Sequence, residues 1–327
     1  MEENNAPGAE RTRFDYLQGR IELLKKQIAS VIVGQQQTVD LLLTAILADG
    51  HVLLEGVPGV AKTLLAKLTA RLIKADFSRI QFTPDLMPSD VLGTSVFDMQ
   101  SGRFEFHRGP VFANIVLVDE INRAPAKTQS ALFEVMEERQ ATVDGTTYPM
   151  SIPYIVLATQ NPVEQEGTYK LPEAQLDRFL MKITIDYPSA DEELEILTRH
   201  QQRRDFLNLA SVEPVLDCTE MQELKEYARE VFVDPSLLRY MVQIVQQTRQ
   251  SKAVYLGASP RATVGLLHAS KAYALLRGSD FVTPDDVKFV APYVLQHRVI
   301  LTAEAEMEGW SVVKAVRRLI DKVEVPQ

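Results

Sequence analysis

A glycine-containing loop, placed between an expected strand and an expected helix, is the first place where this sequence could do chemistry. Lys62 and Thr63 follow the loop directly. Glycines let backbone N–H groups cradle phosphate oxygens, a lysine neutralises phosphate charge, and a threonine hydroxyl is a ligand suited to Mg²⁺. The spacing therefore predicts an ATP site with bound Mg²⁺, formed by Gly56, Val57, Pro58, Gly59, Val60, Ala61, Lys62 and Thr63.

One position of this loop departs from the usual pattern G-x-x-x-x-G-K-[ST]. Ala61 stands where the second glycine belongs. An alanine is strained at positive φ, because its Cβ crowds the backbone there. We therefore expect Ala61 to have a negative φ, as in the first turn of the helix that follows.

Two carboxylates come next, directly after a run of apolar residues. Asp119 and Glu120 follow Ile115–Val118, which is typical of a strand buried on both faces. Acids at the carboxyl end of a parallel strand lie beside the phosphate loop. We expect Asp119 to hold Mg²⁺ together with Thr63, directly or through water, and Glu120 to polarise the water that attacks the γ-phosphate.

Two further polar residues stand at ends of expected elements. Asn161 follows the strand expected at Tyr154–Leu157, where it could orient the water or the γ-phosphate. Arg178 ends a short helix. Taken alone, each has a plain alternative, because Asn-Pro is a common turn and an arginine at a helix end is commonly solvated.

The elements that must position these residues alternate between short apolar runs and helical stretches. This alternation predicts a parallel sheet with helices on both faces, with strands at His51–Glu55, Arg79–Phe82, Ile115–Val118, Tyr154–Leu157 and Lys182–Ile185. Two inserted segments, Thr94–Phe106 and Arg139–Ile152, predict β-hairpins. The turn residues of both, Asp98–Gly102 and Asp144–Thr147, are neither basic nor aromatic.

After Tyr187 the strand signals largely disappear. We expect a polar, disordered tail at residues 1–12, an α/β nucleotide-binding domain at 13–188, and a smaller all-α domain at 189–327. Ser189 with Glu192, and Thr219 with Gln222, predict capping boxes at helix N-termini in this last part.

Composition limits the function classes. The chain has 327 residues and a formal net charge of −9, which gives no electrostatic drive towards nucleic acid or an anionic membrane. No apolar run approaches the ~18 residues of a membrane span, and the N-terminus has no signal-peptide pattern, so a cytoplasmic protein is expected. The five histidines show no metal-ligand spacing, and a single cysteine excludes an intrachain disulfide.

Taken together, these motifs resemble those of the MoxR family of bacterial AAA+ ATPases, which are P-loop NTPases with a helical lid. The resemblance covers nearly the whole chain, in the stretches Gly56–Thr63, Phe112–Asn114, Asp119–Ala124, Lys127–Leu132, Ala158–Pro162, Leu171–Phe179 and Ala258–Ala262. It implies roles as Walker A for the loop, Walker B for the acid pair and sensor 1 for Asn161. The family also uses alanine at the position of Ala61.

The resemblance implies further site residues outside the phosphate loop. Arg178 is similar to an arginine finger that reaches a neighbouring subunit's site, with Arg123 as the alternative. Arg261 looks like sensor 2, at the start of a lid helix. Ile32 and Val33 are expected to border the adenine.

The resemblance implies a homo-oligomer, as a hexameric ring, that acts as a chaperone-like remodeller in metal or cofactor insertion or in complex maturation. Such proteins usually work with a partner carrying a von Willebrand factor A domain. Two alternatives remain: a nucleic-acid motor, which the acidic balance disfavours, and a nucleotide-binding regulator without turnover, which the presence of Glu120, Asn161 and Arg178 disfavours.

Overall fold

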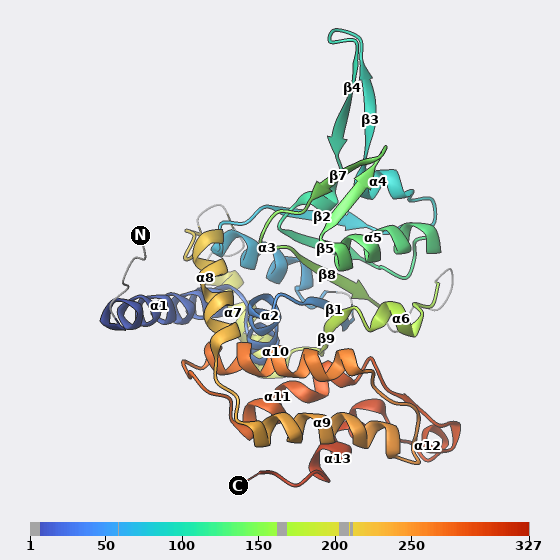
Figure 1. The fold of residues 1–327 in the computed structure, drawn as a ribbon. Coiled ribbons are helices and arrows are strands. Elements are labelled where there is room, and N and C mark those ends of the chain that lie inside the picture. The colour runs from blue at the N-terminus through green and yellow to red at the C-terminus, as the bar shows by residue number, and fades with distance from the viewer. Residues whose placement is uncertain (1–6, 58, 162–168, 203–208, 210–211, 327) are drawn as a thin grey trace.

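The structure is a computed structural model that describes residues 7–57, 59–161, 169–202, 209 and 212–326. Its centre is a five-stranded parallel sheet in the order β2-β5-β8-β1-β9 (Figure 1). The strands are β1 (His51–Gly56), β2 (Phe77–Gln81), β5 (Ile115–Asp119), β8 (Ile155–Gln160) and β9 (Phe179–Ile185). Every residue of β5 is buried, as a central strand covered on both faces requires. The predicted parallel sheet is confirmed.

Helices cover both faces of this sheet. Alternate residues of a strand point to opposite faces, so Leu117 packs in one core cluster and Val116 in another. The first cluster holds α1 (Pro7–Val31), α2 (Gln36–Leu47) and α3 (Lys62–Leu72); the second holds α4 (Pro88–Leu92), a short 3-10 helix η1 (Pro110–Phe112) and α5 (Ala126–Glu138). This arrangement places the loop after β1 on the α3 side of the sheet.

Both predicted hairpins are present. One pairs β3 (Gly93–Asp98) with β4 (Arg103–Arg108), and the other pairs β6 (Gln140–Val143) with β7 (Thr146–Pro149). The β3–β4 hairpin projects far from the body of the molecule (Figure 1). Its base is held by Phe106, whose ring stacks on Tyr148 of β7 with centroids 4.3 Å apart.

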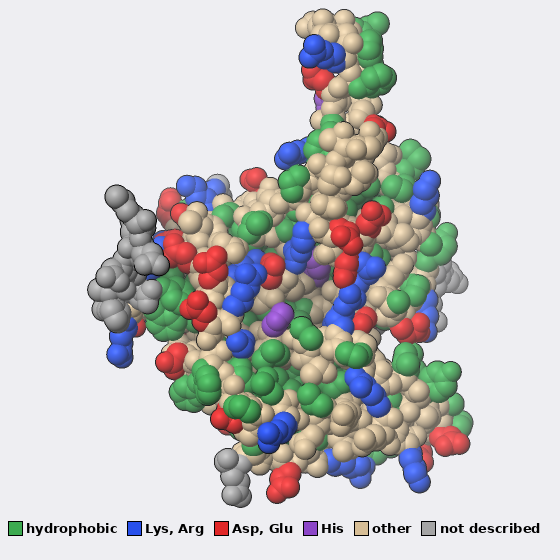
Figure 2. All heavy atoms as spheres, in the orientation of Figure 1, with side chains coloured by type: hydrophobic (Ala, Val, Ile, Leu, Met, Phe, Trp, Pro, Cys, Tyr) green, Lys and Arg blue, Asp and Glu red, His purple; other side chains and the backbone are tan. Residues whose placement is uncertain are grey.

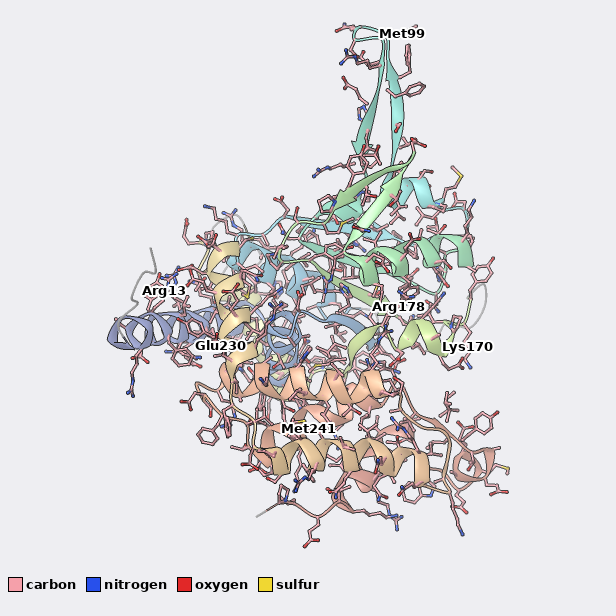
Figure 3. The ribbon with its side chains drawn as sticks, in the orientation of Figure 1. Arg13, Met99, Lys170, Arg178, Glu230 and Met241 are labelled. Carbon is pink, nitrogen blue, oxygen red and sulfur yellow. The ribbon has the colours of Figure 1, made fainter. Side chains whose placement is uncertain are left out.

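The outer part of the β3–β4 hairpin carries aromatic rings that its turn residues did not predict. Phe97 and Phe104 pair across the two strands in an edge-to-face contact, and they are 51% and 73% exposed. Met99 stands at the tip (Figure 3), and apolar side chains line one side of the hairpin in Figure 2. The turn is neither basic nor aromatic, but the strands beside it present an apolar surface to solvent.

The second part of the chain is helical, and most of its helices lie below the sheet in Figure 1. After α6 (Glu173–Leu176) and β9 it contains α7 (Ala190–Gln202), α8 (Cys218–Glu230), α9 (Pro235–Gln250), α10 (Pro260–Leu276), α11 (Pro284–Leu295), α12 (Ala303–Met307) and α13 (Val312–Asp321). It also holds one antiparallel pair, β10 (Val254–Leu256) with β11 (Ile300–Leu301). Within the described ranges, no helix is long and apolar enough to cross a membrane.

The structure differs from two local predictions. Helix α1 begins at Pro7, so residues 7–12 are helical where a disordered tail was expected, and residues 1–6 lie outside the described part. Arg13 ties this helix to α8 through Glu223, with Nε 2.9 Å from Oε2. The cap of α8 is Asp217, with Glu220 as its partner, because the Asp217 carboxylate already accepts the first free N–H groups. The predicted box of Thr219 and Gln222 is therefore wrong, whereas Ser189 and Glu192 do contact one another as expected.

A buried histidine at the start of β1 couples the sheet to α5 and predicts a pH effect. His51 Nδ1 accepts from the Val156 N–H, and Nε2 lies 3.0 Å from the Met136 carbonyl oxygen, so a neutral ring bonded at both nitrogens fits. Burial, with the Arg139 cation nearby, lowers the pKa of His51 to about 3. The unfolded chain binds a proton below about pH 6.5, while the folded chain does not.

We therefore expect His51 to reduce stability as pH falls from about 6.5 towards 3, by about 1.4 kcal/mol per pH unit. His51→Gln should lower stability at neutral pH but flatten this slope. Urea unfolding of both proteins at several pH values measures the difference, in which all other titrating groups cancel. Parallel slopes for the two proteins would show that His51 is protonated in the folded state.

Candidate active site

The phosphate-binding loop runs from Gly56 at the end of β1 to Thr63 in the first turn of α3. A Cβ on Gly56 would lie 2.6 Å from the carbonyl oxygen of Ile185 in β9, so only glycine fits this close approach. Gly59 has φ 89°, a left-handed conformation that glycine adopts freely. These two glycines let the chain curl from strand to helix. Pro58 lies outside the described residues.

The expectation for Ala61 is wrong. Its φ is 58° and its ψ 19°, so it is left-handed and precedes α3 rather than joining its first turn. A non-glycine residue there costs roughly 1–2 kcal/mol. The surroundings hold it in place, since the Ala61 carbonyl accepts from the Leu65 N–H, and the side-chain amide of Gln35 donates to the adjacent Val60 carbonyl. The loop thus keeps the glycine-type conformation although the residue is alanine.

Lys62 lies within the curve of the loop. Its Nζ donates to the carbonyl oxygens of Gly56 at 2.6 Å and Val57 at 3.3 Å. Partial burial lowers the pKa of Lys62, and the negative charges of Asp119, Glu120 and Glu55 oppose that shift. The lysine is therefore a cation placed close to the strand-end carboxylates, where the sequence predicted it.

Asp119 and Glu120 are both held by neighbouring side chains. Asp119 Oδ1 accepts from the Thr159 hydroxyl at 3.2 Å, and Oδ2 lies 2.5 Å from Arg79 Nε. Glu120 Oε2 accepts from Gln81 Nε2 and from Arg123 Nε, each at 3.0 Å. The Glu120 N–H donates to the Thr159 hydroxyl, which links both acids to β8.

Three of the residues that hold these acids were not predicted as site residues from the sequence. They are Arg79, Gln81 and Thr159. The signal that could have found Arg79 and Gln81 is their spacing, since alternate residues of a strand share one face. That spacing points to the acid pair only once β2 is known to lie beside β5.

Asn161 follows the end of a central strand. It follows β8, the strand between β5 and β1, one residue beyond Gln160, which pairs with Glu55. The structure thus brings the phosphate loop, the acid pair and Asn161 to the same edge of the sheet. This edge is the one at which open α/β sheets bind ligands.

The donors at this edge fit a magnesium nucleotide. A threonine hydroxyl and a carboxylate are hard oxygen ligands of the kind Mg²⁺ prefers. Gln35 Oε1 is buried with no hydrogen-bond partner among the described residues, which leaves an acceptor free for a donor on a ligand. Ile32 and Val33 lie between α1 and Gln35. They are only 4% and 7% exposed, so an adenine ring could contact only a small part of each side chain.

Arg178 and Arg261 lie at the opposite end of the strands, where β1 and β9 begin. Arg178 Nη1 donates to the Phe133 carbonyl at 2.8 Å and lies 3.5 Å from Glu137 Oε2, while Arg261 Nη2 lies 2.7 Å from Glu137 Oε1. Phe179, next to Arg178, pairs with His51 at the start of β1. The phosphate loop begins five residues further along β1, about 17 Å away at the usual rise. Arg261, expected near the nucleotide, is thus placed with Arg178 and away from its own chain's loop.

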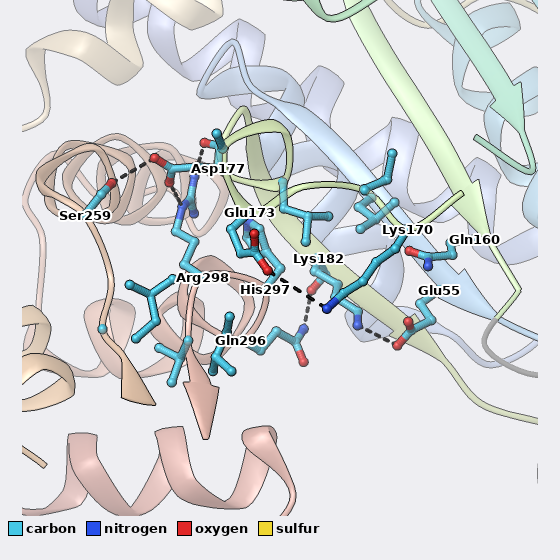
Figure 4. Close-up of a pocket in the computed structure, with 18 residues that line it drawn as sticks. Glu55, Gln160, Lys170, Glu173, Asp177, Lys182, Ser259, Gln296, His297 and Arg298 are labelled. Carbon is cyan, nitrogen blue, oxygen red and sulfur yellow. Dashed lines mark hydrogen bonds and ion pairs between the residues drawn. The ribbon is translucent and has the colours of Figure 1, made fainter. Parts of the chain in front are cut away.

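A cavity of about 440 Å³ lies between α6, β9 and the lid (Figure 4). Glu55 pairs there with Lys182 at 2.7 Å, and Asp177 binds both Ser259 and the buried Arg298. The described residues of the phosphate loop do not line it. Asp177 therefore fixes the segment that carries Arg178 to the lid. The cavity reaches the carboxyl ends of β1 and β8 at Glu55 and Gln160, beside the phosphate loop.

The comparisons with known proteins agree with this fold. Residues 51–181 match the family model described as "ATPase family associated with various cellular activities (AAA)", and residues 246–319 match the AAA lid domain. A solved structure of a provisionally assigned ATPase from Cytophaga hutchinsonii superposes with a TM-score of 0.90 and 41% identity, covering 98% of this chain and 99% of the other. The chain therefore has the AAA-type nucleotide-binding domain with its lid.

Relatives define the family more narrowly. Chaperone MoxR1 of Mycobacterium tuberculosis is 46% identical over 92% of this chain and 81% of its own length. The uncharacterised protein YeaC of Bacillus subtilis is 49% identical over 92% of this chain and 93% of its own length. The chain belongs to the MoxR family of AAA+ ATPases.

Proposed function

We propose that this protein binds ATP with Mg²⁺ and hydrolyses it to ADP and phosphate. The observation that carries this proposal is the convergence of Lys62, the acid pair Asp119–Glu120 and Asn161 at the carboxyl edge of one parallel sheet. Phosphoryl transfer requires positioning and charge neutralisation rather than covalent chemistry. These side chains are of the types and in the place that such a reaction needs.

Each residue has one role in this proposal. Lys62 exchanges its two loop carbonyls for the β- and γ-phosphates, which are stronger acceptors. Thr63 and Asp119 hold the magnesium ion, which when bound neutralises phosphate charge. Glu120 accepts a hydrogen bond from the attacking water, and Asn161 orients that water or the γ-phosphate. Gln35, Ile32 and Val33 border the base.

Removal of the Lys62 ammonium should abolish tight ATP binding. We expect Lys62→Ala to weaken binding by at least about 10²-fold, because a charge-assisted contact to phosphate is lost in a partly buried site. Lys67→Ala is the matched control, since Lys67 lies on the same helix and faces the ring of Phe77 instead. Calorimetric titration with ATP measures both. Tight binding by Lys62→Ala would remove the loop from its assigned role.

The positions of Arg178 and Arg261 support a homo-oligomer, and we propose a hexameric ring. Both arginines lie too far from their own phosphate loop but are partly exposed at the opposite edge, 30% and 49% by side chain. A site on one edge and its arginines on the other require a head-to-tail contact between copies, which closes into a ring. Arg123 instead contacts Glu120 of its own chain, so Arg178 is the finger in this proposal.

We further propose that the ring is a chaperone-like remodeller that aids metal or cofactor insertion or complex maturation, with a partner that carries a von Willebrand factor A domain. The relative named a chaperone supports this role. So does the β3–β4 hairpin, whose apolar side with Phe97 and Phe104 suits a polypeptide. Exposed rings can also stack on nucleic-acid bases. However, the charges beside them, Asp98, Arg103 and Glu105, are mixed rather than basic.

A further inference from the structure

The strand β2 sends two polar side chains towards the acid pair. Arg79 and Gln81 alternate along β2, so they share one face, and β2 pairs directly with β5. Arg79 reaches Asp119 and Gln81 reaches Glu120. Arg79 pairs with Leu117 of β5, so both side chains lie on the same face of the sheet. Leu117 packs against α3 on that face. Arg79 therefore contacts Asp119 on the same side of the sheet as the phosphate loop.

In the part of the chain that the structure describes, three carboxylates at this edge each pair with a cation. Glu55 pairs with Lys182 at 2.7 Å, Glu120 with Arg123 at 3.0 Å, and Asp119 with Arg79 at 2.5 Å. Lys62, a further cation, is directed to loop carbonyls. Arg79 is thus the group that neutralises Asp119, the residue assigned to the metal.

The contact leaves little room for a second cation. Asp119 Oδ1 is already engaged by the Thr159 hydroxyl, and Oδ2 by Arg79 Nε. Mg²⁺ demands oxygen ligands at about 2.0–2.1 Å with near-octahedral geometry. An ion or its bound water that takes Oδ2 must therefore compete with the guanidinium, since two cations on one oxygen repel one another.

The two partners differ in their freedom to move. The Arg79 side chain is 50% exposed, whereas the Asp119 side chain is 11% exposed. Arg79 can swing into solvent at little cost, but Asp119 stays fixed by β5 and by Thr159. The exchange is therefore one in which the arginine leaves and the carboxylate remains.

Building on the proposed function, we propose that Arg79 competes with Mg²⁺ for Asp119 Oδ2 and thereby sets the magnesium affinity of the site. It is a positioning residue that touches the metal ligand rather than the nucleotide. Because linkage is reciprocal, a metal that displaces Arg79 binds less tightly than it would without the arginine. Half-saturation of the site then requires a higher Mg²⁺ concentration than it would if Arg79 were absent.

The test is the magnesium dependence of ADP binding, which involves no turnover. We expect Arg79→Met to lower the half-saturating Mg²⁺ concentration by about tenfold, within the usual range of coupling between sites, and to leave ADP affinity in EDTA nearly unchanged. Arg79→Lys, which keeps the charge, should stay near the wild type. Lys182→Met is the matched control, since it removes a cation paired with Glu55 at the same edge and should not shift the magnesium midpoint.

A second readout uses the metal alone. Mg²⁺ without nucleotide should raise the melting temperature of Arg79→Met more than that of the wild type, because Asp119 is then unpaired. An unchanged or higher magnesium midpoint in Arg79→Met, or an equal shift in Lys182→Met, would overturn the competition. Failure of the wild type to bind ADP under any condition is a different result, which would contradict the proposed function itself.

Discussion

Glu120→Gln should stop ATP turnover while leaving ATP binding intact. The amide keeps the size of the carboxylate and can still contact Gln81, but it cannot accept a proton from water as the anion does. Loss of such a group typically costs about 10²–10⁴-fold in rate. Steady-state phosphate release and calorimetric binding of ATP, measured on the same preparation, give the two quantities.

Glu55→Gln separates this role from a general need for negative charge. Glu55 is the second-last residue of β1, at the same edge, and its negative charge also raises the pKa of Lys62, but its carboxylate pairs with Lys182 in the cavity beside the lid. Its amide variant should retain turnover within a few-fold. If both variants were equally slow, the effect would come from the electrostatics of Lys62, and Glu120 would lose its proposed role.

The sheet and the phosphate loop could be predicted because their signals are local. A buried strand such as Ile115–Asp119 is apolar at every position but its last, and that last residue is the acid itself. The parallel topology then brings the loop, the acids and Asn161 to the same edge of the sheet. Predicting a site at the carboxyl edge thus required only short stretches of sequence and the rule that ligands bind at the carboxyl ends of parallel strands.

The conformation of Ala61 could not be obtained in this way. Its neighbours favour helix, and an alanine at a helix start normally has negative φ. Its left-handed φ of 58° is imposed by the path from β1 to α3 and by the contact of Gln35 with the loop. Tertiary structure overrides the local preference here.

The contacts of Arg79 and Arg261 were hidden for a related reason. Arg79 meets Asp119 across 40 positions, and Arg261 meets Glu137 across 124. Such pairs depend on strand order and on how the lid packs, which periodicity does not reveal. The exposed rings of Phe97 and Phe104 were also not predicted, because they lie on the strands beside the turn and the prediction concerned the turn residues alone.

Mixing two inactive variants should restore ATPase activity if Arg178 acts across a subunit boundary. Arg178→Ala should lower turnover by about 10³–10⁵-fold, as loss of an arginine finger does. In a mixed ring, an Arg178→Ala subunit keeps its own Glu120 and can receive Arg178 from a Glu120→Gln neighbour. With equal random mixing, about a quarter of the head-to-tail interfaces combine the intact halves.

The same mixture made with Arg123→Ala is the matched control for that experiment. Arg123 contacts Glu120 of its own chain, so an Arg123→Ala subunit carries its defect in its own site, and a Glu120→Gln neighbour should not rescue it. Subunits are mixed before assembly, and phosphate release is followed against protein concentration. Rescue of Arg123→Ala instead of Arg178→Ala would exchange the two assignments. Full activity of Arg178→Ala by itself would show that hydrolysis needs no finger from the segment before β9. The geometric argument for the ring would then fail, because it rests on an arginine at the opposite end of the strands from its own phosphate loop.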